Sequence, residues 1–381
     1  MKICIVNNGF GMGGVERVST TLANSFNKAG DNVTIIDFSG LHNYYYNFDD
    51  NIKIVNDINK RTIRRKIITI IEKLYYRIYK KQLSVKNIYK EQLADLIKHL
   101  KKNKYDALVL CQGELTALIP YLKEVYPNLK IIAWQHNEYH IYTGKYFVKF
   151  INEYLEGVEL ADAVVCLTEK DAKEFKKINP KTYCIYNPST ITINEISNLS
   201  TKNIIFVGRL IIEQKGLDYL LTIAENLDPG WKINIAGDGA DRVKFQKCVR
   251  KRGLENKINI LGSLGTKELR ALYLSGSIFI STSRWEGFGL VLTEAMAAGL
   301  PVISFDNAGP VEILKNGEYG VVVKNHDIQS FIKELKELMN NIDLRRDYQK
   351  KSLMRLKDFD IDRIIKKWYQ VLKNKKNLKD Y

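Results

Sequence analysis

The stretch of sequence that decides the fold spans residues 281–305 and reads STSRWEGFGLVLTEAMAAGLPVISF. It begins at the end of an apolar run, passes through a glycine-containing loop, and continues as a helical pattern that Gly299 ends before a second apolar run. A strand, a helix and a second strand in this order predict one βαβ unit of a parallel sheet. The two acids, Glu286 and Glu294, would lie about 12 Å apart on one continuous helix, so they can share a ligand only by contacting different parts of it.

The same alternation of apolar runs and helical patterns extends over the whole chain, which is typical of parallel sheets with crossover helices. The expected strands are residues 2–6, 33–38, 107–110, 131–134 and 163–167 in the first half, and residues 204–207, 232–235, 258–261, 278–281 and 302–305 in the second. The predicted fold class is therefore α/β, with two Rossmann-like parallel-sheet domains facing a cleft.

A polar stretch rich in Asn, Ser and Thr separates the two halves at residues 187–203. We expect a first domain over residues 1–190 and a second over residues 200–358. Residues 359–381 are expected to form a C-terminal helix and tail, and Trp368 gives this helix an aromatic side that can pack back on the first domain.

Composition excludes several classes of protein. The chain has 381 residues, of which 45% are hydrophobic and only 7 are Pro, so wholesale disorder and a fibrous repeat do not fit. No run approaches the roughly 18 apolar residues of a membrane-spanning helix, and the first residues lack the apolar core of a signal peptide. The five cysteines form no CxxC pair, which favours buried free thiols in a reducing cytosol over disulfides or a metal site.

The net charge of +16 is concentrated in residues 60–104, where fifteen Lys or Arg and three acids leave +12. The apolar residues that recur there at helical spacing are Ile63, Ile67, Ile70, Ile71, Leu74 and Ile78. Basic residues and tyrosines lie between them, which is typical of a helix in the interface of an anionic membrane. A solvated helix on a lysine-rich chain is the alternative. Nucleic acid is disfavoured, since no RNA- or DNA-binding module accompanies the segment.

A glycine-rich turn, GFGMGG at residues 9–14, follows the first expected strand. Glycines let the backbone approach a ligand, and the start of the next helix offers unpaired N–H groups to a phosphate. Gly9, Gly11 and Gly14 also satisfy GxGxxG, and Asp37 ends the second strand where a dinucleotide enzyme carries its ribose-binding acid. An NAD(P)-dependent oxidoreductase is therefore one hypothesis, and a purely structural tight turn is another.

Two cations of the second half, Arg209 and Lys215, follow an expected strand on its carboxyl side, where parallel sheets bind ligands. Arg recognises a diphosphate through paired hydrogen bonds and Lys acts as a point charge. Two unrelated surface cations are the alternative. Gly287 and Gly289 allow the loop after residue 281 to meet the same ligand, and a carboxylate there is a good acceptor for vicinal sugar hydroxyls.

Three segments together resemble a known family: GGVER at residues 13–17, VGRLIIEQKG at 207–216, and EGFGLVLTEAMAAGLPVI at 286–303. In this order, and in two Rossmann-like halves, they are similar to glycosyltransferase family 4, the retaining GT-B enzymes that use nucleotide sugars. The resemblance covers almost the whole chain. It is especially close to bacterial enzymes that extend lipid-linked glycans or surface polysaccharides.

The resemblance implies roles for individual residues. The implied substrate-binding residues are Gly13, Gly14, Arg209, Lys215, Gly262, Leu264, Glu286, Phe288, Gly289, Leu290 and Glu294. Gly13 and Gly14 would lie against the diphosphate and the donor sugar, and Glu294 would bind the ribose hydroxyls. Gly262 to Leu264 would approach the base, while Glu286 and the backbone of Phe288 to Leu290 would contact the transferred sugar or the phosphates.

The implied catalytic residues are His136, Glu286, Arg209 and Lys215. His136 follows the expected strand 131–134, where relatives often carry a histidine that touches the donor sugar. An ordinary loop histidine is the alternative, and His140 could be confused with it. No enzymic nucleophile stands out, so we expect front-face transfer, in which the arginine and lysine stabilise the leaving diphosphate without a metal or other cofactor.

The resemblance also implies the partners. The donor is expected to be a nucleotide sugar, most simply a UDP-sugar, bound by the second domain, with both halves closing over it. The acceptor is expected to be a lipid-linked saccharide, contacted by loops of the first domain at residues 111–114 and 139–145. We expect a cytoplasmic protein on the inner face of the cell membrane, held there by residues 60–104. A catalytically inactive sugar-nucleotide-binding protein is a further alternative.

Overall fold

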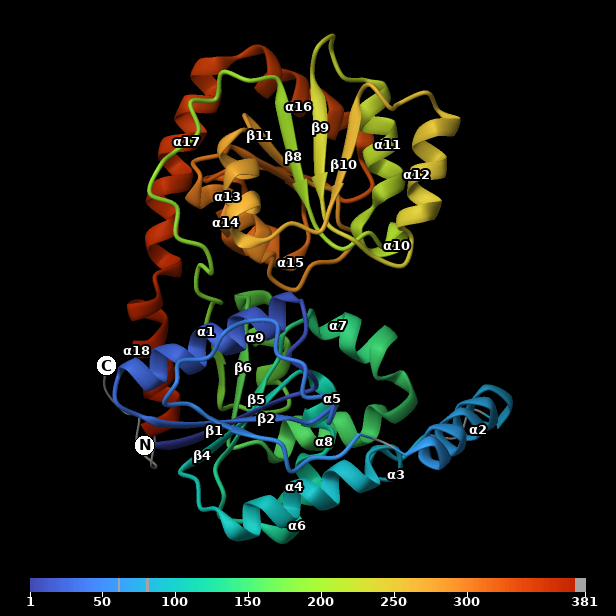
Figure 1. Ribbon diagram of the computed structural model, residues 1–381, viewed down its shortest axis with the longest axis vertical. Helices are drawn as coiled ribbons and strands as arrows, with labels where there is room; N and C mark the ends of the chain where they lie inside the picture. The colour runs from blue at the N-terminus through green and yellow to red at the C-terminus, as the bar shows by residue number, and fades with distance from the viewer. Residues whose placement is uncertain (61, 80–81, 374–381) are drawn as a thin grey trace. The chain divides into compact units, whose positions relative to one another are not determined.

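A computed structural model describes residues 1–60, 62–79 and 82–373. The chain divides into two compact units (Figure 1). Unit 1 holds residues 1–188 together with the chain from Ile361 onward, and unit 2 is Ser189–Asp360. The chain thus leaves unit 1 inside the polar stretch around Pro188.

Within the described residues, unit 1 contains a seven-stranded parallel sheet of order β3-β2-β1-β4-β5-β6-β7. The strands are β1 (Lys2–Asn7), β2 (Asn32–Asp37), β3 (Lys53–Val55), β4 (Ala107–Cys111), β5 (Ile131–Trp134), β6 (Ala163–Cys166) and β7 (Thr182–Cys184). Ile3 of the central strand pairs with Val33 on one side and Ala107 on the other. The strands are mostly buried, since helices cover both faces of the sheet.

The helices of unit 1 are α1 (Gly14–Lys28), α2 (Ile63–Tyr79), α3 (Val85–Ile88), α4 (Lys90–Lys102), α5 (Gly113–Thr116), α6 (Ile119–Val125), α7 (Tyr139–Ile141), α8 (Ile151–Leu160), α9 (Glu169–Lys176) and α18 (Ile361–Lys373). A π-helical turn (Tyr142–Tyr146) and a 3-10 turn (Val148–Phe150) link α7 to α8. The five cysteines of the chain are free thiols.

The C-terminal helix α18 packs on the sheet of unit 1, as the sequence predicts. Trp368 is buried, with its ring 4.9 Å from that of Trp134 and 6.4 Å from that of Phe26. The Tyr369 hydroxyl donates to Asp31 at 2.5 Å. The Lys130 ammonium donates to two carbonyls in the last turn of α18, where a cation also complements the helix dipole.

The six-stranded parallel sheet of unit 2, as far as the structure describes it, has the order β10-β9-β8-β11-β12-β13. Its strands are β8 (Asn203–Val207), β9 (Lys232–Ala236), β10 (Ile258–Gly262), β11 (Ile278–Ser281), β12 (Val302–Phe305) and β13 (Val321–Val323). Its helices are α10 (Ile212–Lys215), α11 (Leu217–Glu225), α12 (Arg242–Lys251), α13 (Thr266–Leu274), α14 (Leu290–Ala297), α15 (Ala308–Ile313), α16 (Ile328–Asn340) and α17 (Ile342–Leu356). The predicted fold class, two Rossmann-like parallel-sheet units, is confirmed.

Three strands were not expected from the sequence: β3, β7 and β13. Each has only three residues and lies at the end of its unit's chain of paired strands. Such short segments carry little periodicity of their own, and pairing with a longer neighbour makes them strands.

The described part of the basic segment 60–104 contains three helices, α2, α3 and α4, and these differ in environment. In α4 the apolar residues Leu93, Leu96 and Leu100 are buried in the core of unit 1, whereas the apolar stripe of α2 is exposed. In this segment α4 is therefore an ordinary core-packing helix, and the exposed aliphatic side chains lie on α2. No helix among the described residues is both long enough and apolar enough to cross a bilayer.

Candidate active site

The predicted site residues of unit 2 gather where the strand order of its sheet reverses. From β8 the chain continues through β9 to β10 on one side, whereas β11 and the later strands lie on the other. Ligands of open parallel sheets bind outside the carboxyl ends of strands at such a point. Arg209 and Lys215 follow β8, and Glu286 follows β11, so the topology brings these residues to one edge.

Lys215 and Glu286 form an ion pair. The Lys215 ammonium donates to the Glu286 carboxylate, which also accepts a bond of 3.4 Å from the Ser283 hydroxyl. Lys215 is only 9% exposed. Glu286 is partly exposed, and loss of either partner would leave the other charge poorly compensated in a largely desolvated place.

Backbone contacts fix the turn that carries Lys215. Gly216 has a φ of +60°, and an added Cβ would lie 2.1 Å from the carbonyl oxygen of Thr282. The Thr282 hydroxyl donates to the carbonyl of Lys215 at 2.8 Å, and the Arg284 N–H donates to Gln214 at 2.8 Å. The loops after β8 and β11 are thus joined, and only glycine fits where they meet.

Arg284, which the sequence did not single out, supports the same loop. Its guanidinium donates to both carboxylate oxygens of Asp218 and to the Tyr219 hydroxyl, and it lies 4.0 Å from the centre of the Tyr219 ring. The hydrogen bond to Asp218 raises the pKa of Arg284. Asp218 and Tyr219 lie in the first turn of α11. In the sequence, the only signal for their contact with Arg284 is their position directly after Lys215 and Gly216.

Arg209 differs from Lys215 in being exposed. Its side chain makes no hydrogen bond or ion pair within the described residues. The preceding Gly208 is packed tightly, since a Cβ on Gly237 would lie 1.9 Å from the Gly208 carbonyl oxygen. A fixed backbone therefore presents an open guanidinium, which suits an anion arriving from solvent.

Glu294 lies on α14 and is 1% exposed. Its carboxylate accepts hydrogen bonds of 2.9 Å from the Thr190 hydroxyl and from the Tyr273 hydroxyl. A carboxylate that accepts from two hydroxyls has the chemistry expected for binding the two hydroxyls of a ribose. To bind Glu294 in this way, a ribose hydroxyl would have to replace that of Thr190 or Tyr273. The structure brings Glu294 next to Thr190 and Tyr273, neither of which the sequence indicated.

The loop before α14 is tightly packed. Gly289 has a φ of +97° at the start of the helix, and Phe288 is buried with its ring 5.8 Å from that of Phe359. A Cβ on Gly309 would lie 2.2 Å from the Phe288 carbonyl oxygen. Leu290 is the first residue of α14.

The segment predicted to approach a base lies at the end of β10. Gly262 has a φ of +77° and follows a register shift in the pairing with β9, and Leu264 is half-buried. A Cβ on Gly262 would lie 3.5 Å from the Arg242 guanidinium, which is paired with Asp238 at 3.0 Å. Arg242 is therefore a cation of this region that the sequence analysis missed.

In unit 1 the glycine-rich turn precedes α1, which starts at Gly14 with Gly13 as its N-cap. A Cβ on Gly13 would lie 2.1 Å from a carboxylate oxygen of Glu16, so the Glu16 side chain folds back over the start of the helix. A carboxylate there stabilises the positive end of the helix dipole.

Asp37, the residue that suggested a dinucleotide, has a structural role. It is fully buried, and its carboxylate accepts bonds from the Ser39 N–H at 2.8 Å, the Ser39 hydroxyl at 2.6 Å and the His42 N–H at 2.8 Å. Both oxygens are thus committed to the turn after β2. This arrangement disfavours the NAD(P) hypothesis, which needs this acid for a ribose.

His136 lies beyond β5 with its ring 4.3 Å from that of Trp134. Burial lowers the pKa of His136 to about 3, so the ring is neutral at physiological pH. Its buried Nε2 has no hydrogen-bond partner in the part of the chain that the structure describes. A neutral ring nitrogen without a partner is suited to a ligand hydroxyl, whereas His140 is exposed.

A second polar group lies where the strand order of unit 1 reverses, between β1 and β4. Gln112 has a φ of +79°, which is rare for a residue with a side chain, and its amide donates to Asn7 at 2.9 Å. The Glu114 carboxylate accepts from the Asn8 amide at 2.6 Å and from the Tyr89 hydroxyl at 3.0 Å. Strained backbone of this kind is concentrated at functional sites.

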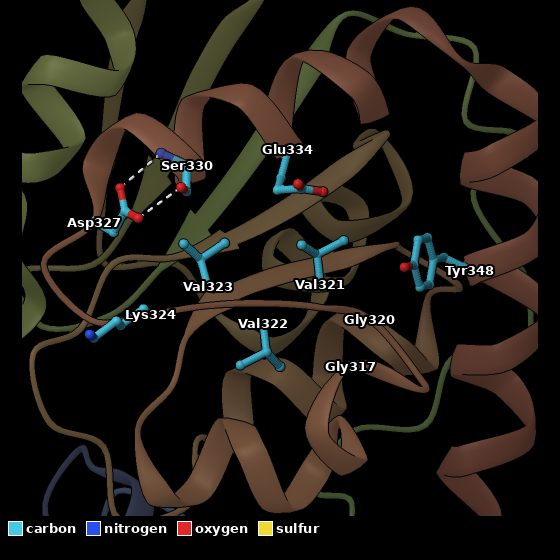
Figure 2. Close-up of a pocket in the computed structure, with 10 residues that line it drawn as sticks. All are labelled: Gly317, Gly320, Val321, Val322, Val323, Lys324, Asp327, Ser330, Glu334 and Tyr348. Carbon is cyan, nitrogen blue, oxygen red and sulfur yellow. Dashed lines mark hydrogen bonds between the residues drawn. The ribbon is translucent and has the colours of Figure 1, made fainter.

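A surface pocket lies elsewhere in unit 2, beside edge strand β13 (Figure 2). It is lined by Val321 to Lys324 together with Asp327, Ser330 and other residues, none of them predicted as a site residue. Asp327 accepts from the N–H and the hydroxyl of Ser330 and so caps α16. Among the described residues, no three His, Cys, Asp or Glu side chains lie together as a metal site would require.

Comparison with known families agrees with the two units. The family described as "Glycosyltransferase Family 4" matches residues 12–189, and the one described as "Glycosyl transferases group 1" matches residues 191–353. An uncharacterized glycosyltransferase of Haemophilus influenzae is 30% identical over 369 residues, covering 94% of this chain and 96% of its own.

Two other comparisons are informative. The Campylobacter jejuni GalNAc-alpha-(1->4)-GalNAc-alpha-(1->3)-diNAcBac-PP-undecaprenol alpha-1,4-N-acetyl-D-galactosaminyltransferase is 25% identical over 388 residues, 99% of either chain. The crystal structure of Anabaena Alr3699/HepE in complex with UDP and glucose has a TM-score of 0.74 at 16% identity, and the match covers 98% of this chain and 99% of that one.

The structural likeness defines the class of protein: an α/β transferase fold of the GT-B type, built from two parallel-sheet units. The sequence matches add the family. The chain belongs to glycosyltransferase family 4 and is a glycosyltransferase enzyme, so the predicted family is confirmed.

Proposed function

We propose that the enzyme is a retaining glycosyltransferase that moves a sugar from a nucleoside-diphosphate sugar, most simply a UDP-sugar, to a lipid-linked saccharide. The reaction would serve bacterial surface polysaccharide assembly on the cytoplasmic face of the membrane. The observation that carries the donor half is the pairing of Lys215 with Glu286, beside exposed Arg209, at the point where strand order reverses. The bound UDP of the Anabaena relative supports the choice of nucleotide.

In this proposal Lys215 and Arg209 bind the diphosphate. Lys215 is held in place by its ion pair and turn, and Arg209 is open to solvent. Fixed cations stabilise the charge that develops on a leaving diphosphate without the need to reorganise solvent. This provides the charge stabilisation that a metal ion supplies in other transferases, and we propose that neither a metal nor another cofactor is required.

We propose front-face transfer. The bond between the anomeric carbon and the donor phosphate oxygen breaks while the acceptor oxygen bonds to the same face of that carbon. The acceptor proton passes to the leaving phosphate oxygen, so configuration is retained without an enzyme-bound sugar. Glu286, paired with Lys215, and neutral His136 would then position and stabilise the sugar rather than attack it.

The acceptor half of the proposal rests on unit 1. Glu114, oriented by Asn8 and Tyr89, offers a carboxylate to acceptor hydroxyls beside the strained Gln112. The Campylobacter relative acts on a saccharide joined through a diphosphate to undecaprenol, which supports a lipid-linked acceptor here.

One binding experiment tests the donor half. UDP, other nucleoside diphosphates and NAD are titrated into the wild-type protein and into the variants Arg209→Ala and Lys215→Ala. We expect UDP to bind, and each variant to weaken it about 10- to 100-fold, since a hydrogen bond to a charged group contributes roughly 1.5–3 kcal/mol. Lys244→Ala, which removes an exposed cation of α12, is the matched control and should bind UDP as wild type.

Two outcomes would contradict the proposal. Binding of NAD without any nucleoside diphosphate would support the oxidoreductase. Binding of a nucleotide sugar with no turnover on any saccharide acceptor would indicate an inactive sugar-nucleotide-binding protein.

A further inference from the structure

Helix α2 (Ile63–Tyr79) exposes its apolar stripe. Figure 1 shows that it extends away from the sheet of unit 1 next to α3. Six aliphatic side chains on it are each more than half exposed, between 52% and 78%: Ile63, Ile67, Ile70, Ile71, Leu74 and Ile78. At about 100° per residue they fall within an arc roughly 100° wide, so they form one continuous stripe.

The opposite side of α2 faces the rest of unit 1. Thr69 is buried, and Arg65, Glu72 and Tyr76 are half-buried. Tyr76 packs against the core, with the Lys149 ammonium 5.6 Å from its ring centre. These inward residues lie about 180° around the helix from the aliphatic stripe.

This orientation is the reverse of that of an ordinary surface helix, which turns its apolar stripe to the core and its polar side to water. Water contact with six adjacent aliphatic side chains is unfavourable, and contiguous exposed patches of this kind mark interaction surfaces. The neighbouring α4 shows the ordinary arrangement, with Leu93, Leu96 and Leu100 buried. The inversion is therefore a feature of α2 that the neighbouring α4 does not share.

Charge indicates what covers the stripe. Lys66 and Arg77 are exposed along one side of it, while Tyr75 and Tyr79, 47% and 64% exposed, lie along the other with their ring centres 4.4 Å apart. The helix sequence has five basic residues and one acid. Aliphatic side chains between cations and tyrosines match the acyl boundary and anionic headgroups of a bilayer. A second copy would bring the same positive charge against this one.

We propose that α2 lies in the plane of an anionic membrane, with its aliphatic stripe inserted at the acyl boundary and Lys66 and Arg77 at the lipid phosphates. The assignment rests on α2 alone. Only its purpose, access to a lipid-linked acceptor, rests on the proposed function. The proposal narrows the membrane-contacting region from residues 60–104 to α2 alone. It also places Arg65 on the side of α2 that faces the protein, away from the lipid.

The test uses the full chain and sedimentable vesicles of phosphatidylcholine with about one third phosphatidylglycerol, without donor or acceptor. Wild-type protein should bind, and the paired substitution Ile67→Glu and Ile71→Glu should weaken binding at least 10-fold. Lys66→Ala with Arg77→Ala should weaken it less, about 3- to 10-fold. Because insertion is apolar, binding should be reduced but retained in about 0.5 M salt, where purely electrostatic adsorption is lost.

The matched control is Val243→Glu, which places the same charge on a 63% exposed aliphatic position of α12 in unit 2 and should bind as wild type. Since Ile67 and Ile71 are exposed, the paired variant should keep the wild-type unfolding midpoint and UDP affinity. Vesicle binding by the paired variant equal to wild type would overturn the proposal. The proposal would also be overturned if the wild-type protein formed a dimer that did not bind vesicles and that became a monomer in the paired variant.

The outcomes distinguish the two proposals. Vesicle binding that depends on Ile67 and Ile71, in a protein that transfers no sugar, would leave the membrane surface intact and overturn the proposed function. Transfer to a lipid-linked acceptor by a protein that binds no vesicle would support the proposed function and overturn the proposed membrane surface.

Discussion

The candidate donor residues of unit 2 and the candidate acceptor residues of unit 1 lie at equivalent points of two similar sheets, yet they differ in chemistry. In unit 2 charges are paired and fixed: Lys215 with Glu286, and Arg284 with Asp218. In unit 1 the Glu114 carboxylate accepts hydrogen bonds from two neutral groups, the Asn8 amide and the Tyr89 hydroxyl. The difference fits our proposal that unit 2 binds a diphosphate and unit 1 binds uncharged hydroxyls.

The largest expected effect comes from breaking the charged pair. Lys215→Ala should lower kcat/KM about 10²- to 10³-fold, because it removes a cation proposed to meet the leaving diphosphate and leaves Glu286 without its buried partner. Steady-state transfer assays measure this, with Lys244→Ala as control. A loss of less than threefold would show that unit 2 does not depend on this pair.

Glu114→Gln should reduce transfer about 10- to 100-fold and leave UDP affinity unchanged. The neutral amide keeps the shape of the side chain but is a weaker acceptor for hydroxyls than a carboxylate. Transfer rates and UDP titration on the same preparation separate the two effects. Parallel loss of UDP binding would contradict the division of roles between the units.

His136 should affect both transfer and acid stability. His136→Asn should lower transfer about 10-fold, the loss of one hydrogen bond. Because the folded pKa of about 3 lies below the ordinary 6.5, the folded state binds fewer protons between these values. His136 therefore lowers wild-type stability by up to about 1.4 kcal/mol for each pH unit below 6.5.

Urea unfolding at several pH values measures this contribution. The free energy of unfolding of His136→Asn should fall less steeply between pH 6.5 and 3 than that of wild type. Equal slopes for the two proteins would show that the ring is not held neutral.

The smallest effect is expected at Asp37. Asp37→Asn should cost about 1–3 kcal/mol of stability, since it weakens a buried acceptor of three hydrogen bonds. Transfer should be unchanged once the protein is folded. A specific loss of nucleotide binding, with stability intact, would restore a ligand-binding role for this acid.

The two units also differ in how far the sequence predicted them. The approach of Lys215 and Glu286 to one edge of the sheet was predictable because both follow buried strands and stand in contiguous motifs. The contacts of Glu114 with Asn8 and Tyr89 join three separate parts of the chain, which no local pattern reveals. The spacing of Asp37 from the glycine-rich turn matched that of a dinucleotide-binding acid, but its carboxylate stabilises the turn after β2.

Helix α2 shows a different limit of sequence analysis. Periodicity identifies an amphipathic helix but does not state which side faces the protein. The identity of the inward side depends on residues outside the helix, such as Lys149 beside Tyr76. Likewise the three-residue strands β3, β7 and β13 exist because a neighbouring strand offers them hydrogen bonds.

The return of α18 to unit 1 has a consequence for synthesis on the ribosome. Trp368 covers Phe26 and Trp134, which are translated long before it. Residues 189–360 are all made before residue 361 emerges, so unit 2 can fold while the aromatic core of unit 1 still lacks its last helix. Unit 1 is thus the first unit to be synthesised and the last to be completed. Termination of the chain before α18 would expose the interior of unit 1 to chaperones and proteases and leave unit 2 intact.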